Sequence, residues 1–274
     1  MPNRKAPGPD GIQNEVLKAA REVLAPAMAG IFSACLEIGY FPIAFRETLT
    51  VILRKEGKAD YSLPSSYRPI ALENTLGKIL EKLVTERLSK VLERNSLLPN
   101  TQFGARKHRS VNSALALLTE ATQTVWKTNP EMIVSMLSLD LSAAFDNVSH
   151  ARLLEQFTKK GLPLWLRNFV EGFLTQRRTR LLFDGQKGPE IHTQTGIPQG
   201  SPLSPILFLL FSSGLLEATN KDEAGHIGLG FVDDTNLIVW SRSAEVNCRK
   251  LERLHKECKT WAQKSGAAFA PEKY

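Results

Sequence analysis

Three aspartates stand out in this 274-residue sequence because their positions suit metal chemistry. Asp233 and Asp234 are adjacent and lie between two apolar stretches, which predicts two short strands joined by a tight turn at the pair. Asp140 lies near the end of another apolar stretch, residues 133–141. Adjacent carboxylates repel each other, and burial beside apolar strands adds a desolvation cost. If the strands are neighbours, three carboxylates converge at one edge of a sheet.

Two interpretations of these acids are open from the residues alone. Mg²⁺ takes carboxylate oxygens as ligands, and two such ions about 3.5–4 Å apart can hold the attacking and leaving oxygens of a phosphoryl displacement. Alternatively, an Asp-Asp turn is simply solvated and a strand-end aspartate is a cap. Taken alone, the pair favours the second interpretation, so the surrounding sequence must decide.

The elements that position these acids follow from the spacing of apolar residues. The pattern predicts a strand at 48–53, a buried strand at 133–141 and a hairpin turn at Asp184-Gly185. Pro26 is expected to end the first helix, Ser110 to cap a later one, and Leu83 to lie on the apolar face of the helix at 76–93. Helices are expected over residues 12–25, 28–38, 76–93, 110–126, 150–161, 162–174, 201–219 and 246–266. This order indicates an α+β fold, with helices packed on one side of a small antiparallel sheet.

Composition narrows the class of partner. Apolar residues make up 42%, enough for a sizeable core, and the net charge is +7. The surplus is concentrated in residues 61–130, with ten Lys and Arg against five Asp and Glu, which favours contact with a polyanion such as nucleic acid. Three scattered cysteines suggest neither a zinc site nor a disulfide framework, and a reduced, intracellular compartment fits best. The longest apolar run, 206–211, is too short to span a bilayer, so no membrane partner is expected.

The surroundings of the three acids are specific. Seven segments occur in a fixed order: KAPGPDGI (5–12), LRKEGKADYSLPSSYRPIAL (53–72), TQFGARKHRS (101–110), LSLDLSAAFDNVSH (137–150), GIPQGSPLSPILFLLF (196–211), GFVDDTNLIV (230–239) and GAAFAPEKY (266–274). Together they resemble reverse transcriptases, most closely those of non-LTR (LINE-type) retrotransposons. Group II intron enzymes are the weaker match, because they usually show Pro-Gln-Gly-Gly where this chain has PQGSPLSP.

The resemblance implies a right-hand polymerase fold made of fingers and palm. It predicts one reverse transcriptase domain over 1–274, with approximately 1–130 mainly fingers and 131–274 mainly palm, some fingers elements being interleaved. Nothing in the sequence matches the thumb, endonuclease, zinc-knuckle or RNase H regions of full elements, so the thumb is expected to be absent.

The resemblance also assigns roles to individual residues. Asp140, Asp233 and Asp234 are expected to be the catalytic, metal-binding triad, and the backbone carbonyl of Leu141 is expected to complete the shell of the second metal. Two Mg²⁺ ions are the expected cofactors, with Mn²⁺ as an alternative. Residues expected to bind the deoxynucleotide are Lys55, Arg68, Phe145, Gln199, Gly200 and Lys273. Residues expected to contact nucleic-acid phosphates are Arg106, Lys107 and Arg109.

Each of these assignments has a plainer alternative. Phe145 also fits a core aromatic, and Gln199 with Gly200 also fits a simple helix-entry turn. The lysines and arginines also fit solvated surface charges. Ala270 stands where relatives commonly have asparagine, which weakens the assignment of Lys273.

The resulting function is an RNA-directed DNA polymerase that transfers a nucleotide from a dNTP to a primer 3′-hydroxyl, with an RNA template and a DNA primer as partners. The alternative is a truncated, catalytically inactive remnant that still binds nucleic acid. A metal-dependent nuclease is a distant third. The protein is expected in the nucleus or cytoplasm as part of a retroelement ribonucleoprotein.

Overall fold

The computed structural model describes residues 2–220 and 225–271, which form two compact units. Unit 1 comprises Met1–Leu88 and Leu154–Ser204, and unit 2 comprises Ser89–Leu153 and Pro205–Tyr274. Each unit therefore combines two separate stretches of the chain. The predicted assignment of residues to fingers and palm stays a prediction.

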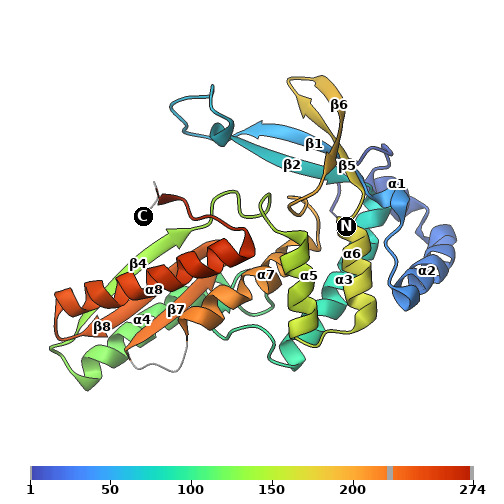
Figure 1. Ribbon diagram of the computed structural model, residues 1–274. Coiled ribbons are helices and arrows are strands. Elements are labelled where there is room, and N and C mark those ends of the chain that lie inside the picture. The colour runs from blue at the N-terminus through green and yellow to red at the C-terminus, as the bar shows by residue number, and fades with distance from the viewer. Residues whose placement is uncertain (1, 221–224, 272–274) are drawn as a thin grey trace. The chain divides into compact units, whose positions relative to one another are not determined.

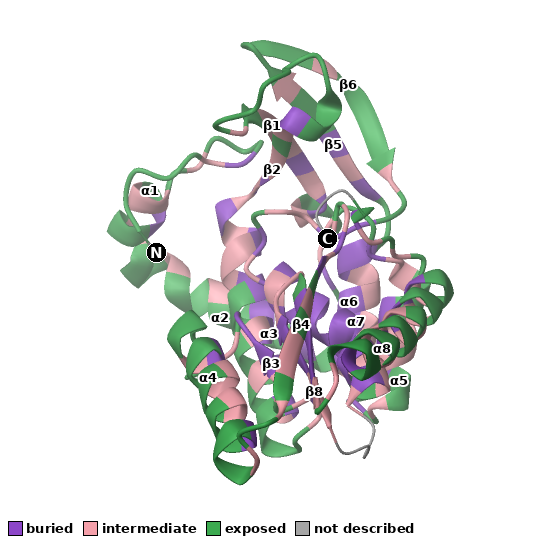
Figure 2. Cartoon of the chain, turned by 90° about the vertical axis from the view of Figure 1, so that its left-hand side faces the viewer, coloured by how far each residue is buried: buried purple, intermediate pink, exposed green. Residues whose placement is uncertain are grey.

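Unit 1 contains a four-stranded sheet with strand order β2-β1-β5-β6. β1 pairs with β5 in parallel, whereas β1–β2 and β5–β6 are antiparallel. β6 is mostly exposed (Figure 2). The elements, two of which extend into unit 2, are α1 (Asn14–Ala19), α2 (Arg21–Ile38), η1 (Ile43–Phe45), β1 (Glu47–Arg54), η2 (Pro64–Ser66), β2 (Tyr67–Glu73), α3 (Thr75–Arg94), α5 (His150–Lys159), α6 (Leu164–Leu174), β5 (Arg177–Phe183) and β6 (Gln186–Thr193).

Local sequence explains the main features of unit 1. Asp184 and Gly185 both have positive φ, 50° and 78°, as a two-residue hairpin turn between twisted strands requires. Phe41 packs edge-to-face against Phe169 and Phe173 of α6, with ring centroids 5.5 and 5.3 Å away. This aromatic cluster fixes the segment after α2 against α6.

Unit 2 contains a second four-stranded sheet, which includes β4, β7 and β8 (Figure 1). Its strand order is β3-β7-β8-β4. β3–β7 is parallel, and β7–β8 and β4–β8 are antiparallel. Its elements are β3 (Gln102–Phe103), α4 (Val111–Thr128), β4 (Ile133–Asp140), α7 (Ser204–Thr219), β7 (His226–Phe231), β8 (Asp234–Ser241) and α8 (Ala244–Ser265).

Both faces of the unit 2 sheet are covered because side chains alternate along β8. Leu237 and Val239 pack against Leu254 and Cys258 of α8, whereas Ile238 packs on the opposite face with Ala114 of α4. The surface of α8 away from the sheet is exposed (Figure 2). The side chains packed on its two faces hold β8 in place, and β8 begins at Asp234.

The fold confirms the mixed helix-and-strand prediction but corrects two details. Within the described residues there are eight α-helices and eight strands, arranged in two sheets rather than one. Each sheet contains a parallel pair, so the prediction of a single antiparallel sheet was wrong. The parallel partners are far apart in sequence and leave no local signal. Pro26 also lies inside α2 instead of ending a helix, and the break falls at Ala20.

Candidate functional site

The register of β4 and β8 brings the predicted acids together. Asp140, the last residue of β4, lies directly opposite Asp234, the first residue of β8. Directly opposed residues of an antiparallel pair point to the same face with Cβ atoms about 4.5–5.5 Å apart. Asp233 immediately precedes Asp234 in the turn from β7. The backbone therefore gathers three carboxylates that are far apart in sequence at one end of the unit 2 sheet.

The turn itself differs by one residue from the prediction. Phe231 pairs with Asp234, so the two turn residues are Val232 and Asp233 rather than the two aspartates. Val232 has φ +54°, a conformation that a β-branched residue rarely adopts and that is usually maintained by surrounding structure. This unusual backbone lies next to Asp233.

The segment after β3 supports the strained turn. Val232 N donates to Phe103 O at 3.2 Å, and Gly230 N donates to Thr101 O at 3.0 Å. Gly104, with φ +76°, lies so close that a Cβ there would be 2.6 Å from Val232 Cγ2. Only glycine fits this approach without displacing the turn. Sequence reasoning missed the role of Gly104 although it noted the TQFGARKHRS segment.

The three acids are not fully buried. Asp140 and Asp233 are half-buried and Asp234 is exposed. One step along the same face, Ser138 Oγ lies 2.7 Å from Asn236 Oδ1. Among residues 2–220 and 225–271, no three His, Cys, Asp or Glu side chains form a group arranged to hold a metal ion. What fits a divalent cation here is the donor chemistry and the backbone pairing of the acids.

The chain beyond α8 returns to the end of β4. Ala270 N donates to Asp140 O at 2.9 Å, and Ser142 N donates to Ala268 O at 2.8 Å. Leu141, the predicted carbonyl ligand, forms an isolated bridge with Phe269. These bonds fix the backbone on either side of Leu141. The predicted Lys273 lies outside the described residues.

Phe145 is held by a buried aromatic partner. Its ring stacks on Phe208 of α7 with centroids 5.1 Å apart and an interplanar angle of 13°. Phe208 is fully buried, whereas Phe145 is half-buried. One face of the Phe145 ring is therefore fixed against the core, which is compatible both with the predicted contact to the deoxynucleotide and with simple packing.

In unit 1, the two predicted cations of the β1–β2 hairpin have different surroundings. Lys55 Nζ donates to Ser65 O at 3.0 Å and so closes the end of the hairpin. Arg68 lies opposite Leu53 in β2, and its side chain is exposed without an ion pair to a described residue. Arg68 is thus the more accessible of the two for an anionic ligand.

The turn containing Gln199 and Gly200 is docked on β2. Gln199 O accepts from Ala71 N at 2.7 Å. Gly200 has φ +132°, and a Cβ there would lie 2.5 Å from Ala71 O. A side chain at position 200 would therefore push the turn away from β2. Gln199 is half-buried, and its role in binding a nucleotide stays a prediction.

The three residues predicted to contact phosphate differ in exposure and in the bonds they make within the protein. Arg106 bonds Glu93 at 2.7 and 2.8 Å, as well as the carbonyls of Pro99 and Gln102, and its side chain is 3% exposed. The Arg106 hydrogen bond lowers the pKa of the Glu93 carboxyl.

The other two predicted contacts are less enclosed. Arg109 bonds Asn100 and lies over the Phe103 ring at 5.4 Å. Lys107 is exposed. Arg106 thus acts as an internal cross-link, and contact with phosphate stays a prediction for all three.

A buried acidic cluster in unit 1 was not predicted. Glu73 and Glu81 are both 0% exposed, and Arg177 Nη2 bonds Glu73 Oε1 at 2.7 Å. The sequence signal was available: Glu81 lies on the same face of α3 as the fully buried Val84 and Leu88. Conversely, Leu83, predicted on the apolar face, is 38% exposed.

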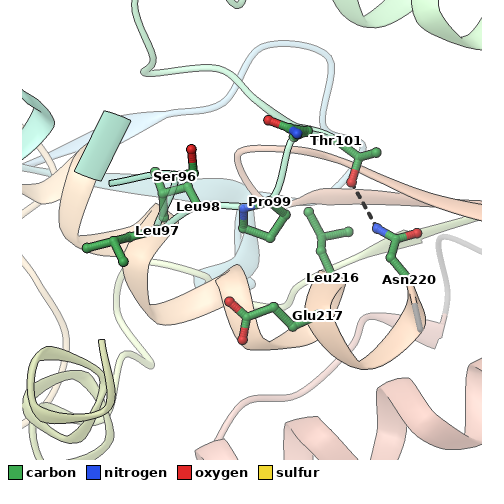
Figure 3. Close-up of a pocket in the computed structure, with 9 residues that line it drawn as sticks. Ser96, Leu97, Leu98, Pro99, Thr101, Leu216, Glu217 and Asn220 are labelled. Carbon is green, nitrogen blue, oxygen red and sulfur yellow. Dashed lines mark hydrogen bonds between the residues drawn. The ribbon is translucent and has the colours of Figure 1, made fainter. Parts of the chain in front are cut away.

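A cavity of about 470 Å³ lies in unit 2 between the segment 96–101 and the end of α7 (Figure 3). Asn220, in the cavity wall, connects two segments of the chain: its side-chain amide donates to Thr101 Oγ1 at 2.9 Å and to Gly228 O at 2.9 Å. None of the predicted site residues lines this cavity.

Comparison with known proteins places these observations in a family. A family model described as reverse transcriptase (RNA-dependent DNA polymerase) matches residues 53–274. The RNA-directed DNA polymerase from mobile element jockey of Drosophila melanogaster is 32% identical over 284 residues, covering 100% of this chain and 30% of that protein. The probable RNA-directed DNA polymerase from transposon X-element of the same species is 30% identical over 240 residues, covering 88% and 26%. The chain spans less than a third of the length of these relatives.

A solved structure shares the fold at low identity. The structure of telomerase from Candida tropicalis in complex with a TWJ fragment of telomeric RNA superposes with a TM-score of 0.63 and 14% identity, covering 85% of this chain and 41% of that one.

Proposed function

This chain belongs to the reverse transcriptase family, and on that premise we propose that it catalyses RNA-templated DNA synthesis. The reaction transfers a nucleotide from a dNTP to a primer 3′-hydroxyl. The 3′-oxygen forms a bond to the α-phosphorus, the bond from that phosphorus to the bridging oxygen breaks, and pyrophosphate leaves. The hydroxyl proton is released from the attacking oxygen.

The observation that carries the proposal is the direct pairing of Asp140 with Asp234, with Asp233 in the adjoining turn. Such acids, on two antiparallel strands and their hairpin, approach a ligand from different directions, which a single strand cannot do. A nuclease also uses acids of this type. The family match favours the polymerase over both the nuclease and the inactive remnant.

In this proposal, Asp140, Asp233 and Asp234 hold two Mg²⁺ ions with the carbonyl of Leu141, and Mn²⁺ is an alternative. When bound, the ions supply charge neutralisation for the attacking and leaving oxygens. The chain itself contributes by holding the carboxylates in position. The Asp140–Ala270 hydrogen bond and the Val232 turn fix the backbone from which the carboxylates project.

Other residues are proposed to orient the nucleotide. Phe145, stacked on Phe208, presents a fixed ring edge to the deoxyribose and disfavours a 2′-hydroxyl. Arg68 offers a bidentate guanidinium to the triphosphate, and Lys55 and Lys273 add positive charge. Gln199 offers an amide to sugar or base, and Gly200 permits close approach.

The proposed partners are an RNA template and a DNA primer, whose phosphates contact Lys107, Arg109 and, more weakly, Arg106. The solved telomerase with a similar fold is described in complex with RNA, which supports a nucleic-acid partner of this kind. No helix among the described residues is long and apolar enough to cross a membrane. Residence in a nuclear or cytoplasmic ribonucleoprotein stays a prediction.

Primer extension tests the proposal. The wild-type chain, alone and joined to the thumb of a relative, is given a primed RNA template, dNTPs and Mg²⁺, and is compared with Asp233→Asn. Incorporation by the wild type and its loss in Asp233→Asn are expected. Electron paramagnetic resonance with Mn²⁺ provides a readout independent of activity: Asp233→Asn should weaken Mn²⁺ binding at least about tenfold. Equal incorporation by both proteins contradicts the assignment of Asp233, and no incorporation by either favours the inactive remnant.

A further inference from the structure

The buried acids of unit 1 lie next to the turn that carries Gln199. Glu73 ends β2, Glu81 lies on α3, and both are 0% exposed. Arg177, at the start of β5, is the cation directly bonded to Glu73. Two buried anions beside one paired cation are costly, because each buried charge needs its own compensation.

The hydrogen bonds of the two carboxyls indicate where a proton resides. Glu73 Oε2 and Glu81 Oε1 have no hydrogen-bond partner among the described residues, and the two buried carboxyls are near enough for each to act on the pKa of the other. Two carboxylates cannot bond each other, because both only accept. One proton placed on Glu81 supplies an O–H donor to Glu73 and satisfies both oxygens.

The surrounding charges agree with this placement. Burial, followed by the charge of Glu73, raises the pKa of Glu81 well above its usual value, against the opposing effects of Arg177, Ser201 and Lys78. Burial also raises the pKa of Glu73, which Arg177 and then Lys78 counteract. Arg46, the other buried cation near Arg177, bonds Phe41 O rather than either acid.

Glu81 is connected to the Gln199 turn through one side chain. Ser201 Oγ donates to Glu81 Oε2 and accepts from Leu203 N at 3.0 Å and Ser204 N at 3.3 Å. On its other side the turn is bonded to β2 through Gln199 O and Ala71 N. The backbone from 199 to 204 is thus held by β2 on one side and by Glu81 on the other.

We propose that Glu81 is a positioning residue that holds the Pro198–Gly200 turn through Ser201, and that it acts as a neutral acid sharing its proton with Glu73. The proton lets Glu81 donate to Glu73 while its other oxygen accepts from Ser201. This part of the inference rests on the proposed function. There, the hydrogen bonds of Glu81 and Ser201 set the position of Gln199 relative to the nucleotide, although Glu81 itself does not contact the nucleotide.

Three variants of the full chain separate the neutral acid from the anion and from simple packing. Glu81→Gln keeps one acceptor for Ser201 and one donor for Glu73, so it copies the protonated acid. Glu81→Ala removes both. Ser201→Ala removes the connection to the turn. Glu86→Gln, at an exposed position of α3, is the matched control.

Stability against pH tests the protonation state. Because the folded-state pKa of Glu81 is raised, the wild type loses stability as pH rises above the ordinary range of a glutamate. Glu81→Gln has no such loss, so its urea midpoint relative to wild type should rise between about pH 5 and about pH 8. A Glu81→Gln midpoint that falls relative to wild type over this range would show that the anion is required and overturn the proposal.

Amide hydrogen exchange and kinetics test the positioning role. In Glu81→Ala and Ser201→Ala, the amides of Leu203 and Ser204 should exchange at least about tenfold faster, and the KM for dNTP should rise roughly tenfold with kcat less affected. Glu81→Gln and Glu86→Gln should match the wild type within about twofold in both measurements.

The outcomes separate this inference from the proposed function. If the wild type incorporates no nucleotide, the proposed function fails, and the exchange rates alone decide the positioning role. If Glu81→Ala changes neither exchange nor KM while lowering stability, Glu81 is only a packing residue and the inference is wrong.

Discussion

The acidic clusters of the two units use the same functional group in opposite surroundings. In unit 1, Glu73 and Glu81 are inaccessible to solvent and bonded to fixed partners. In unit 2, Asp140 and Asp233 are half-buried and Asp234 is exposed at the end of its sheet. A buried carboxyl is stabilised by keeping a proton or a fixed cation, whereas an accessible one can bind and release ligands. The buried acids of unit 1 therefore suit a role in positioning other residues, and the accessible acids of unit 2 suit a role in catalysis.

The two acidic clusters also differ in the kind of structure that supports them. The unit 1 acids belong to a network of side chains, with Arg177 and Ser201 as the partners. The unit 2 acids depend on backbone geometry, namely strand register and the Val232 turn. Loss of one side chain should therefore affect stability and the position of the Gln199 turn in unit 1, and the catalytic step in unit 2.

The largest expected effect is on catalysis at the unit 2 acids. Asp140→Asn should lower primer extension at least about a thousandfold, because it removes a charged ligand while preserving shape. Its melting temperature should stay close to that of the wild type. Asp146→Asn, at an exposed position in the following turn, is the control and should retain activity. A comparable loss in both variants would indicate that general charge, rather than position 140, matters.

The next effect concerns the cation of unit 1. Arg177→Met should destabilise the fold by about 3–5 kcal/mol in urea unfolding, because it leaves the acids without their bonded cation. The loss should grow as pH rises, since the raised pKa values of Glu73 and Glu81 make ionisation in the folded state unfavourable.

Arg178→Met is the control for this change, because the Arg178 side chain is 40% exposed and its ion pair with Glu190, at 3.4 Å, lies at the surface. It should change stability by at most about 1 kcal/mol. Similar losses for the two variants, or a loss independent of pH, would contradict the buried proton-sharing arrangement.

A smaller effect is expected where backbone geometry supports unit 2. Gly104→Ala places a methyl group 2.6 Å from Val232 Cγ2 at a residue with φ +76°, which should cost about 2–3 kcal/mol and reduce activity by moving Asp233. The double variant Gly104→Ala/Val232→Ala removes the clash but keeps the φ strain, so about 1 kcal/mol should remain. Additive losses in urea unfolding of the single and double variants would show that the two residues do not interact.

Local sequence predicted the elements that carry the three candidate catalytic acids but not the structure that supports them. The apolar run within β8 and the near-continuous apolar stretch of β4 were sufficient to predict strands, and the pairing of these strands places Asp140 opposite Asp234. The turn was misplaced by one residue because Val232 at φ +54° goes against its own backbone preference. Sequence patterns describe preferred conformations, so a strained residue at a candidate site escapes them.

Long-range partners were the second limit. Glu81 interrupts the buried stripe of α3, which signals a polar partner, but the identity of Glu73, Arg177 and Ser201 follows only from tertiary structure. The parallel β1–β5 pair likewise joins two strands that are separated in the chain by residues 55–176. Spacing rules act over one element and cannot identify such partners.

The smallest expected effect distinguishes two neighbouring cations in the predicted nucleic-acid contact. Lys107 is exposed, whereas the Arg106 side chain is 3% exposed and bonded to Glu93 and two carbonyls. Lys107→Gln should weaken binding to a primed RNA template less than about tenfold and reduce the slope of log affinity against log salt by about 0.7–0.9, the value for one phosphate contact. Its stability should be unchanged.

Arg106→Gln should show the reverse, with stability lowered by about 2 kcal/mol and the salt slope reduced much less than by Lys107→Gln, because its charge is already neutralised within the protein. The difference should fade as pH falls through the titration of Glu93, whose pKa the Arg106 bond lowers. Titration of labelled template at several salt concentrations, together with urea unfolding, measures both quantities. If Arg106→Gln reduces the slope as much as Lys107→Gln, Arg106 exchanges Glu93 for phosphate on binding, and burial in the free protein does not exclude a cation from the interface.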